Sequence, residues 1–139
     1  MYGGEKMKIK KPLDFSKDIK NSDGFKGMTA NWLWTTDDGI GNFAMRLMEF
    51  EPGGHTSFHA HLEEHQFYFL EGEPAVIDSQ GKETRLSPGD TLYFEPSESH
   101  QVKNIGTTKM SMICMIPILP GADGKKTTKV PGKNTEIGC

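Results

Sequence analysis

The stretch of the chain that decides the fold is residues 59–66, which read HAHLEEHQ. His59 and His61 are two residues apart, so on a β-strand their imidazoles point to the same face. His65 follows a three-residue corner and can return to that face from the next strand, while His100 begins a later strand. Side chains placed in this way converge inside a β-barrel. The pattern therefore predicts a barrel with four histidines in its interior.

Four imidazoles in one place indicate a metal site. The neutral imidazole is a common ligand of Fe, Mn, Ni, Cu and Zn. A single histidine is more often a surface or core residue that carries no metal. A pair at strand spacing with two further histidines favours the metal interpretation. His55 follows Gly54 in a turn and is interpreted as a loop residue outside the site.

Short strands separated by turns are expected over most of the chain, because its 16 Gly and 8 Pro are spread between apolar runs of a few residues. Residues 42–51 alternate, and Pro52, Gly53 and Gly54 are expected to end that strand. Many short strands with almost no helical period favour an antiparallel sandwich or barrel. The further strands are expected at 56–61, 65–71, 74–78, 83–86, 91–95, 100–104 and 110–117.

The chain divides into one domain and two extensions. We expect an N-terminal arm over residues 1–29, a barrel over 30–119 and a C-terminal tail over 120–139. Within the arm, residues 7–11 are expected to form a weak strand or an arm, and residues 13–20 are expected to form one or two helical turns. The tail is rich in Gly, Lys and Thr and is expected to be mobile or to lie over the barrel.

Composition excludes several classes of protein. The 139 residues suit one domain, and 16 Lys+Arg against 19 Asp+Glu give a formal charge of −3, which argues against nucleic acid as a partner. Two cysteines exclude a disulfide framework. The longest apolar run, residues 112–119, is too short to span a membrane. The first residues contain no apolar signal segment, so a cytoplasmic protein is expected.

Two separated motifs resemble those of the cupin family. The first runs from Gly53 through the histidine pair to Gly72, and the resemblance as a whole covers residues 37–117. It implies an all-β fold with a single-domain cupin β-barrel (a double-stranded β-helix, or jelly roll), a divalent metal inside it, and a homodimer. The residues that resemble the second motif are Gly89, Asp90, Pro96, His100 and Asn104.

The first motif departs from the common pattern in an informative way. Many cupins place a glutamate three or four residues after the second histidine, where this chain has His65 and Gln66. The segment is similar instead to the four-histidine, manganese-containing cupins. This similarity favours Mn or Fe as the single divalent transition metal, with Zn, Ni and Cu also compatible. Gln66 is the alternative third ligand, and Glu64 a weaker one. The ligands that the similarity implies are His59, His61, His65 and His100.

A site of this kind suggests a function. Four neutral ligands leave the full charge of a divalent ion, which makes it a stronger Lewis acid than a site with a carboxylate ligand, and they supply no carboxylate base. Two coordination positions remain for a small-molecule substrate or ligand. We expect a metal-dependent oxidoreductase, dioxygenase-like or peroxide-using, that acts on a small organic substrate. The alternatives are a non-catalytic metal-dependent binding or sensing module and a cupin isomerase or lyase.

Three further residues are candidates for the pocket wall: Cys114, Arg46 and Phe67. Met110, Met112, Cys114 and Ile116 share one strand face by parity, so Cys114 is either an oxidisable pocket wall or a small buried apolar residue. Arg46 either meets a substrate carboxylate or lies on an exposed strand face. Phe67 belongs to the aromatic set that builds the core and lines any pocket.

Overall fold

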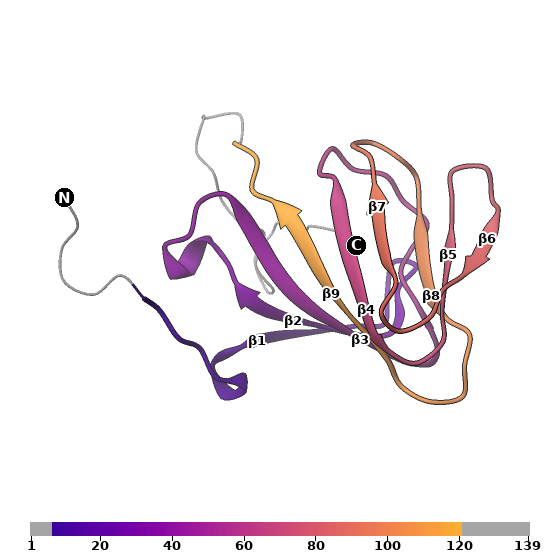
Figure 1. The fold of residues 1–139 in the computed structure, drawn as a ribbon, viewed down its shortest axis with the longest axis horizontal. Helices are drawn as coiled ribbons and strands as arrows, with labels where there is room; N and C mark the ends of the chain where they lie inside the picture. The colour runs from indigo at the N-terminus through magenta and orange to yellow at the C-terminus, as the bar shows by residue number, and fades with distance from the viewer. Residues whose placement is uncertain (1–6, 121–139) are drawn as a thin grey trace.

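The computed structural model describes residues 7–120, and its strands form one antiparallel, strongly curled sheet (Figure 1). Two short 3-10 helices, η1 (Pro12–Asp14) and η2 (Thr36–Asp38), accompany it. The strands are β1 (Ser16–Lys20), β2 (Lys26–Trp34), β3 (Phe43–His55), β4 (His65–Glu71), β5 (Pro74–Ile77), β6 (Glu83–Arg85), β7 (Thr91–Phe94), β8 (Gln101–Asn104) and β9 (Met110–Pro117).

The order of the strands explains the curl. Neighbours follow the order β6-β5-β8-β3-β9-β4-β7, while β2 pairs with β3 and β1 pairs with β2. The 13-residue β3 contacts β2 and β9 along most of its length and reaches β8 through the pair His55–Lys103. In Figure 1 the sheet passes from β1–β3 on the left, through β9 and β4, to β5 and β6 on the right. The predicted all-β jelly roll is confirmed.

The inner face of this sheet holds the core. Along β3, Ala44, Arg46, Met48 and Phe50 are each at most 1% exposed, as the period of two requires for strands with one covered face. Met48 lies opposite Met112 of β9, which in turn lies opposite Phe69 of β4. Full burial of one such side chain contributes roughly 1.5–3 kcal/mol. Burial of this kind therefore holds β3, β9 and β4 in one register.

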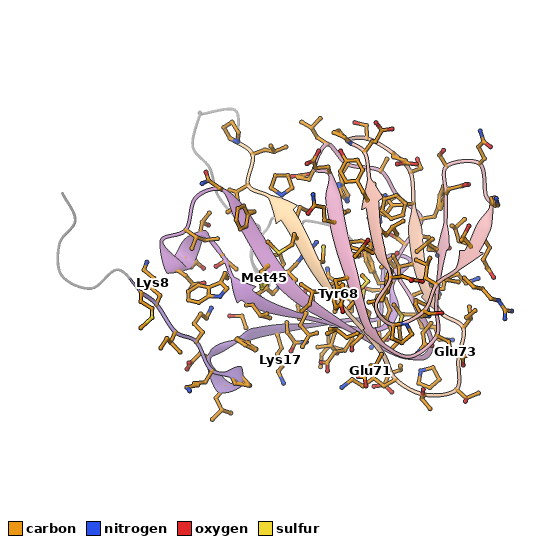
Figure 2. The ribbon with its side chains drawn as sticks, viewed as in Figure 1. Lys8, Lys17, Met45, Tyr68, Glu71 and Glu73 are labelled. Atoms are coloured by element: carbon orange, nitrogen blue, oxygen red, sulfur yellow. The ribbon has the colours of Figure 1, made fainter. Side chains whose placement is uncertain are left out.

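The same register places the functional side chains. Arg46 of β3 lies opposite Cys114 of β9, and Cys114 lies opposite Phe67 of β4. All three are buried. His65 precedes Phe67 by two residues and therefore shares its inward face. By contrast, Met45 and Tyr68, labelled in Figure 2, belong to the alternate set that faces outward.

The N-terminal arm differs from the expectation. Residues 16–20 form strand β1 rather than helical turns, and the only helical residues between 13 and 20 belong to the single 3-10 turn of η1. Residues 7–11 form no strand. β1 pairs in register with β2, from Ser16 opposite Trp32 to Lys20 opposite Met28. The prediction of helix was wrong because edge pairing with β2 outweighs a weak local preference.

Pro52, Gly53 and Gly54 do not end β3, which continues to His55. The β2–β3 pairing shifts register between Lys26 and Met28, and Gly53 has a φ of 79° that glycine adopts without strain. A local irregularity of this kind bends a strand without ending it. His55 is thus a strand end rather than a loop residue.

The expected strand at 56–61 is replaced by an irregular segment. Its backbone pairs with the residues before and within β8, through the His59–His100 bridge and a bond from Thr56 N to Val102 O at 2.9 Å. The predictions for residues 1–6 and for the tail after Pro120 lie outside the described residues.

Candidate metal centre

Four of the five histidines assemble at one place inside the curled sheet. His59 and His61 come from the irregular segment between β3 and β4, His65 opens β4, and His100 directly precedes β8. The backbones of His59 and His100 are joined by two hydrogen bonds, of 2.9 and 3.1 Å. This bridge brings a distant part of the chain to the histidine pair. His65 and His100 are buried, whereas His59 and His61 are half-buried.

The four rings are connected through His61 and His100, each of which contacts the other three. Within the part of the chain that the structure describes, His59, His61 and His100 form a group in which one side-chain nitrogen from each lies within 4.8 Å of the others. His65 joins this group through its Nε2 atom, which lies 2.8 Å from Nε2 of His61. Its ring centroid is 4.5 Å from that of His61 and 5.2 Å from that of His100. The four predicted histidines therefore lie in one cluster.

The Nδ1 atom of each ring is occupied by a partner on the side away from the cluster. Three of these partners lie two residues from their histidine in sequence. The Nδ1 contacts are His59 with Ser57 Oγ (2.5 Å), His61 with Glu63 O (2.9 Å), His100 with Glu98 O (2.7 Å) and His65 with Cys114 Sγ (3.4 Å).

These Nδ1 contacts decide which nitrogen is available. A backbone carbonyl can only accept, so His61 and His100 donate from Nδ1 and keep an unprotonated Nε2 when neutral. The ring of His59 is held through Nδ1 by Ser57 Oγ. Nε2 lone pairs gathered on one side of the rings fit a bound cation, and histidine ligands are commonly oriented in this way by a partner on the second nitrogen.

The surroundings keep His61 neutral. Its pKa is lowered to about 3, first by burial and then by the neighbouring imidazoles of His65, His100 and His59, against the opposing hydrogen bond to Glu63 O. The neutral imidazole is the form that binds metal. The Glu63 carboxylate lies 3.6 Å from His61 Nδ1, on the side that its carbonyl also occupies. The cluster is thus ready to receive a cation without first losing a proton from His61.

Aromatic rings form one wall of the cluster. Phe94 stacks on His100 at 4.3 Å between ring centroids with an interplanar angle of 18°. Phe67 lies 5.2 Å from His65, and Phe25 lies 5.9 Å from His59. Apolar rings in these positions pack against three of the four imidazoles.

Gln66 and Glu64 are not brought into the cluster. Gln66 is exposed and lines a groove of about 440 Å³ on the outer face of β4, β7 and β9, with Tyr68 and Met115 among its neighbours. Its parity is opposite to that of His65, so it points away from the histidines. The Glu64 carboxylate accepts a hydrogen bond from Tyr93 Oη at 2.9 Å. The donor set that the structure assembles is therefore made of imidazoles.

The three pocket candidates all lie on the inner face. Cys114 is fully buried, and its sulfur contacts both Arg46 Nη2, at 3.1 Å, and His65 Nδ1. The Arg46 guanidinium also lies over the ring of Trp32, 5.1 Å from its centroid. Arg46 is thus a buried cation behind the cluster rather than a residue of an exposed strand face. Phe67 is a core residue that also contacts His65.

Sequence reasoning missed the residues that hold the rings. Ser57 lies two residues before His59, and a serine hydroxyl so close in sequence is a common local hydrogen-bond partner, so this contact had a recognisable signal. The contact of Phe94 with His100 needs the fold, because only the chain path after β7 brings the two rings together. The sequence alone has no signal for it.

No helix within residues 7–120 is long and apolar enough to cross a membrane.

Comparisons with known proteins agree with this architecture. Residues 46–116 match the family model described as "Cupin domain". An oxalate-binding protein from Thermotoga maritima is 28% identical over 72 residues, which cover 52% of this chain and 60% of that protein. The chain therefore spans less than two thirds of the length of this relative.

Solved structures show the same fold. The polyketide cyclase RemF from Streptomyces resistomycificus superposes with a TM-score of 0.73 at 24% identity, over 94% of this chain and 89% of that chain. A predicted oxalate decarboxylase from Thermotoga maritima superposes with a TM-score of 0.70 at 25% identity, over 81% of this chain and 100% of that chain. These proteins carry different activities on one barrel, so the fold alone does not choose among them.

Proposed function

The chain belongs to the cupin family, and on that basis we propose that it holds one divalent transition metal, Mn or Fe, through four histidines and binds a small organic anion at that metal. The observation that carries the proposal is the convergence of four imidazoles whose Nδ1 atoms are all occupied by partners outside the cluster. The ligands proposed are His59, His61, His65 and His100.

The charge of the donor set supports an anionic partner. Four neutral imidazoles leave the charge of a divalent ion uncompensated among its ligands, and the nearby Glu63 carboxylate lies behind His61. A carboxylate of the substrate can then supply the negative charge that a glutamate ligand would otherwise supply. The oxalate-binding relative from Thermotoga maritima supports a small carboxylate as the class of molecule bound.

We propose an oxidoreductase as the activity at this site. A Mn or Fe ion held by these histidines would supply redox chemistry toward dioxygen or peroxide. The residues of the chain orient the imidazoles, pack Phe94, Phe67 and Phe25 against them, and keep His61 neutral. The carboxylates of Glu63 and Glu64, from the corner between His61 and His65, are directed to His61 Nδ1 and to Tyr93. This arrangement favours electron transfer over proton abstraction by a carboxylate base.

A second candidate is a binding or sensing module without turnover. It is favoured by one observation, namely that the curated relative is described as a binding protein. On this hypothesis the same cluster retains a carboxylate on the metal and does not change it.

Calorimetry with oxalate tests the proposal and separates the two candidates. Oxalate is titrated into metal-loaded protein, metal-free protein and the His61→Ala variant, with neutral oxamide as the matched control ligand. Binding of oxalate to the metal-loaded protein alone is the expected result, and equal binding to the metal-free protein would contradict it. Oxygen and peroxide consumption with oxalate and other small carboxylates is then measured. Consumption that depends on metal supports the oxidoreductase, and retention without consumption supports the module.

A further inference from the structure

His65 is held differently from the other three histidines. The partners of His59, His61 and His100 are oxygen atoms two residues away in sequence, so each contact is local. The partner of His65 is the sulfur of Cys114, 49 residues away on β9. The orientation of His65 therefore depends on the packing of β4 against β9.

The sulfur of Cys114 is in turn held by a residue of the neighbouring strand, β3. Arg46 of β3 lies opposite Cys114 in the β3–β9 register and donates from Nη2 to Sγ at 3.1 Å. The guanidinium rests on the face of Trp32 from β2, which lies opposite Arg46 in the β2–β3 register. Arg46, Cys114 and His65 are each at most 1% exposed. A continuous buried connection thus runs from β2 through β3 and β9 to His65.

We propose that Arg46 and Cys114 are positioning residues of the metal centre, which act through Nδ1 of His65 to direct its Nε2 into the cluster. The inference deepens the proposed function and rests on it. On this proposal Arg46 helps to orient a metal ligand and does not contact the substrate.

The direction of the hydrogen bonds supports this role. A guanidinium can only donate, so the sulfur is the acceptor toward Arg46, and the positive charge beside it stabilises an electron-rich sulfur. When a metal occupies the cluster, such a sulfur is well placed to accept a second bond from Nδ1–H of His65, while Nε2 of His65 presents its lone pair to the ion. Without a cation, Nε2–H of His65 donates instead to the Nε2 lone pair of His61, 2.8 Å away.

Removal of the sulfur is the first test. Cys114→Ala leaves Nδ1 of His65 without its acceptor and is expected to weaken metal binding by about 10–100-fold, the usual effect of losing a partner of a metal-bound histidine. Cys114→Ser returns an acceptor and is expected to recover most of that loss. The control is Met112→Leu, two residues away on the same buried face of β9. It conserves volume and is expected to leave the affinity unchanged. Affinity is measured by competition with a chelator.

The role of Arg46 is tested by comparing single and double variants of Arg46 and Cys114. Arg46→Met is expected to lower the metal affinity although it is not proposed as a ligand. The double variant Arg46→Met/Cys114→Ala is expected to lose less than the sum of the two single losses, because both act on the same hydrogen bond. Additive losses would contradict a shared action. If Arg46→Met fails to fold, Arg46→Gln removes the charge with a polar side chain and provides the same comparison.

The exchange of the His65 Nδ1 proton with solvent provides a second readout. When the cluster holds diamagnetic Zn²⁺ on Nε2 of His65, the proton of that ring lies on Nδ1, where the Cys114 sulfur is expected to protect it from exchange. Nitrogen-15 NMR should show slow exchange in wild type and faster exchange in Cys114→Ala, and equal rates would overturn the inference. If the wild type binds no metal, the proposed function fails. If metal binds with equal affinity in all variants, the positioning role fails and the proposed function stands.

Discussion

Nε2 of His61 and Nε2 of His65 face each other at a distance of 2.8 Å. Since Nδ1 of His61 donates to the carbonyl of Glu63, Nε2 of His61 carries a lone pair when the ring is neutral. Two neighbouring ligands at right angles on one ion, each about 2.1 Å from it, have nitrogen atoms about 3 Å apart. The separation therefore agrees with two adjacent nitrogen ligands of one metal.

Loss of the most distant histidine is expected to weaken the metal site. His100→Ala removes a ring that contacts the other members of the cluster from 35 or more positions away in sequence. We expect a fall in metal affinity of at least about tenfold with the barrel still folded. Isothermal titration of Mn²⁺ into metal-free wild type and variant measures the change. Equal affinity would mean that the bridge between His59 and His100 is only structural.

The metal-free protein is expected to lose stability in acid because of His61. Its pKa in the folded protein is about 3 against an ordinary value of 6.5, so below pH 6.5 the unfolded chain takes up a proton that the folded chain does not. The free energy of unfolding should therefore be highest above pH 6.5 and should fall as the pH decreases toward 3. Urea unfolding at a series of pH values measures this. His61→Gln should flatten the dependence, and His55→Gln, outside the cluster, should not.

Asn104 is expected to matter for stability and not for the metal. Its side-chain nitrogen donates to the carbonyls of Phe50, Glu51 and Thr108, and its oxygen accepts from Gly106 N. Asn104→Ala removes these bonds, of which the one to Phe50 O is buried, and should lower the free energy of unfolding by about 1–3 kcal/mol. Exposed Asn42 provides the control, since Asn42→Ala should change it by less than about 0.5 kcal/mol. A loss of metal affinity in folded Asn104→Ala would contradict the separation of roles.

Alanine substitutions at Gly72 and Gly81 separate the cost of backbone strain from the cost of steric conflict. Both have positive φ, 88° and 82°, so an alanine at either position costs roughly 1–2 kcal/mol. A Cβ on Gly72 would lie 2.6 Å from Met110 Cα, whereas a Cβ on Gly81 would meet nothing within 4 Å. Gly72→Ala should therefore cost about 1–3 kcal/mol more than Gly81→Ala. Thermal unfolding of the two variants checks the difference, and equal losses would contradict the close packing of β4 against β9.

The sequence predicted the histidine cluster better than it predicted the residues that hold the histidine rings. The spacing of the histidines and the family resemblance predicted that four histidines come together, although His59 and His61 lie on an irregular segment and not on the expected strand. Parity grouped Cys114 with the buried methionines of β9. Parity could not decide whether Arg46 points inward or outward, since the alternation of side chains along a strand does not say which of its two faces is buried. The register of β3 against β9 settles this point.

Contacts between distant residues lay beyond sequence reasoning. The bond between Cys114 and His65 depends on the alignment of β4 with β9, which is set by burial along the whole strand pair. β1 was missed for a related reason, because its residues form a strand only when β2 offers them an edge. The length of β3 was underestimated because Pro52 and Gly53 are tolerated where the pairing shifts.

The metal content of protein purified without an affinity tag tests the central claim most directly. It is measured for wild type, for His61→Ala and for His55→Ala, in which the histidine removed lies outside the cluster. We predict near-stoichiometric Mn or Fe in wild type and His55→Ala and a large loss in His61→Ala. Absence of metal from wild type even after reconstitution, or equal content in His61→Ala, would contradict the proposal of a four-histidine metal centre.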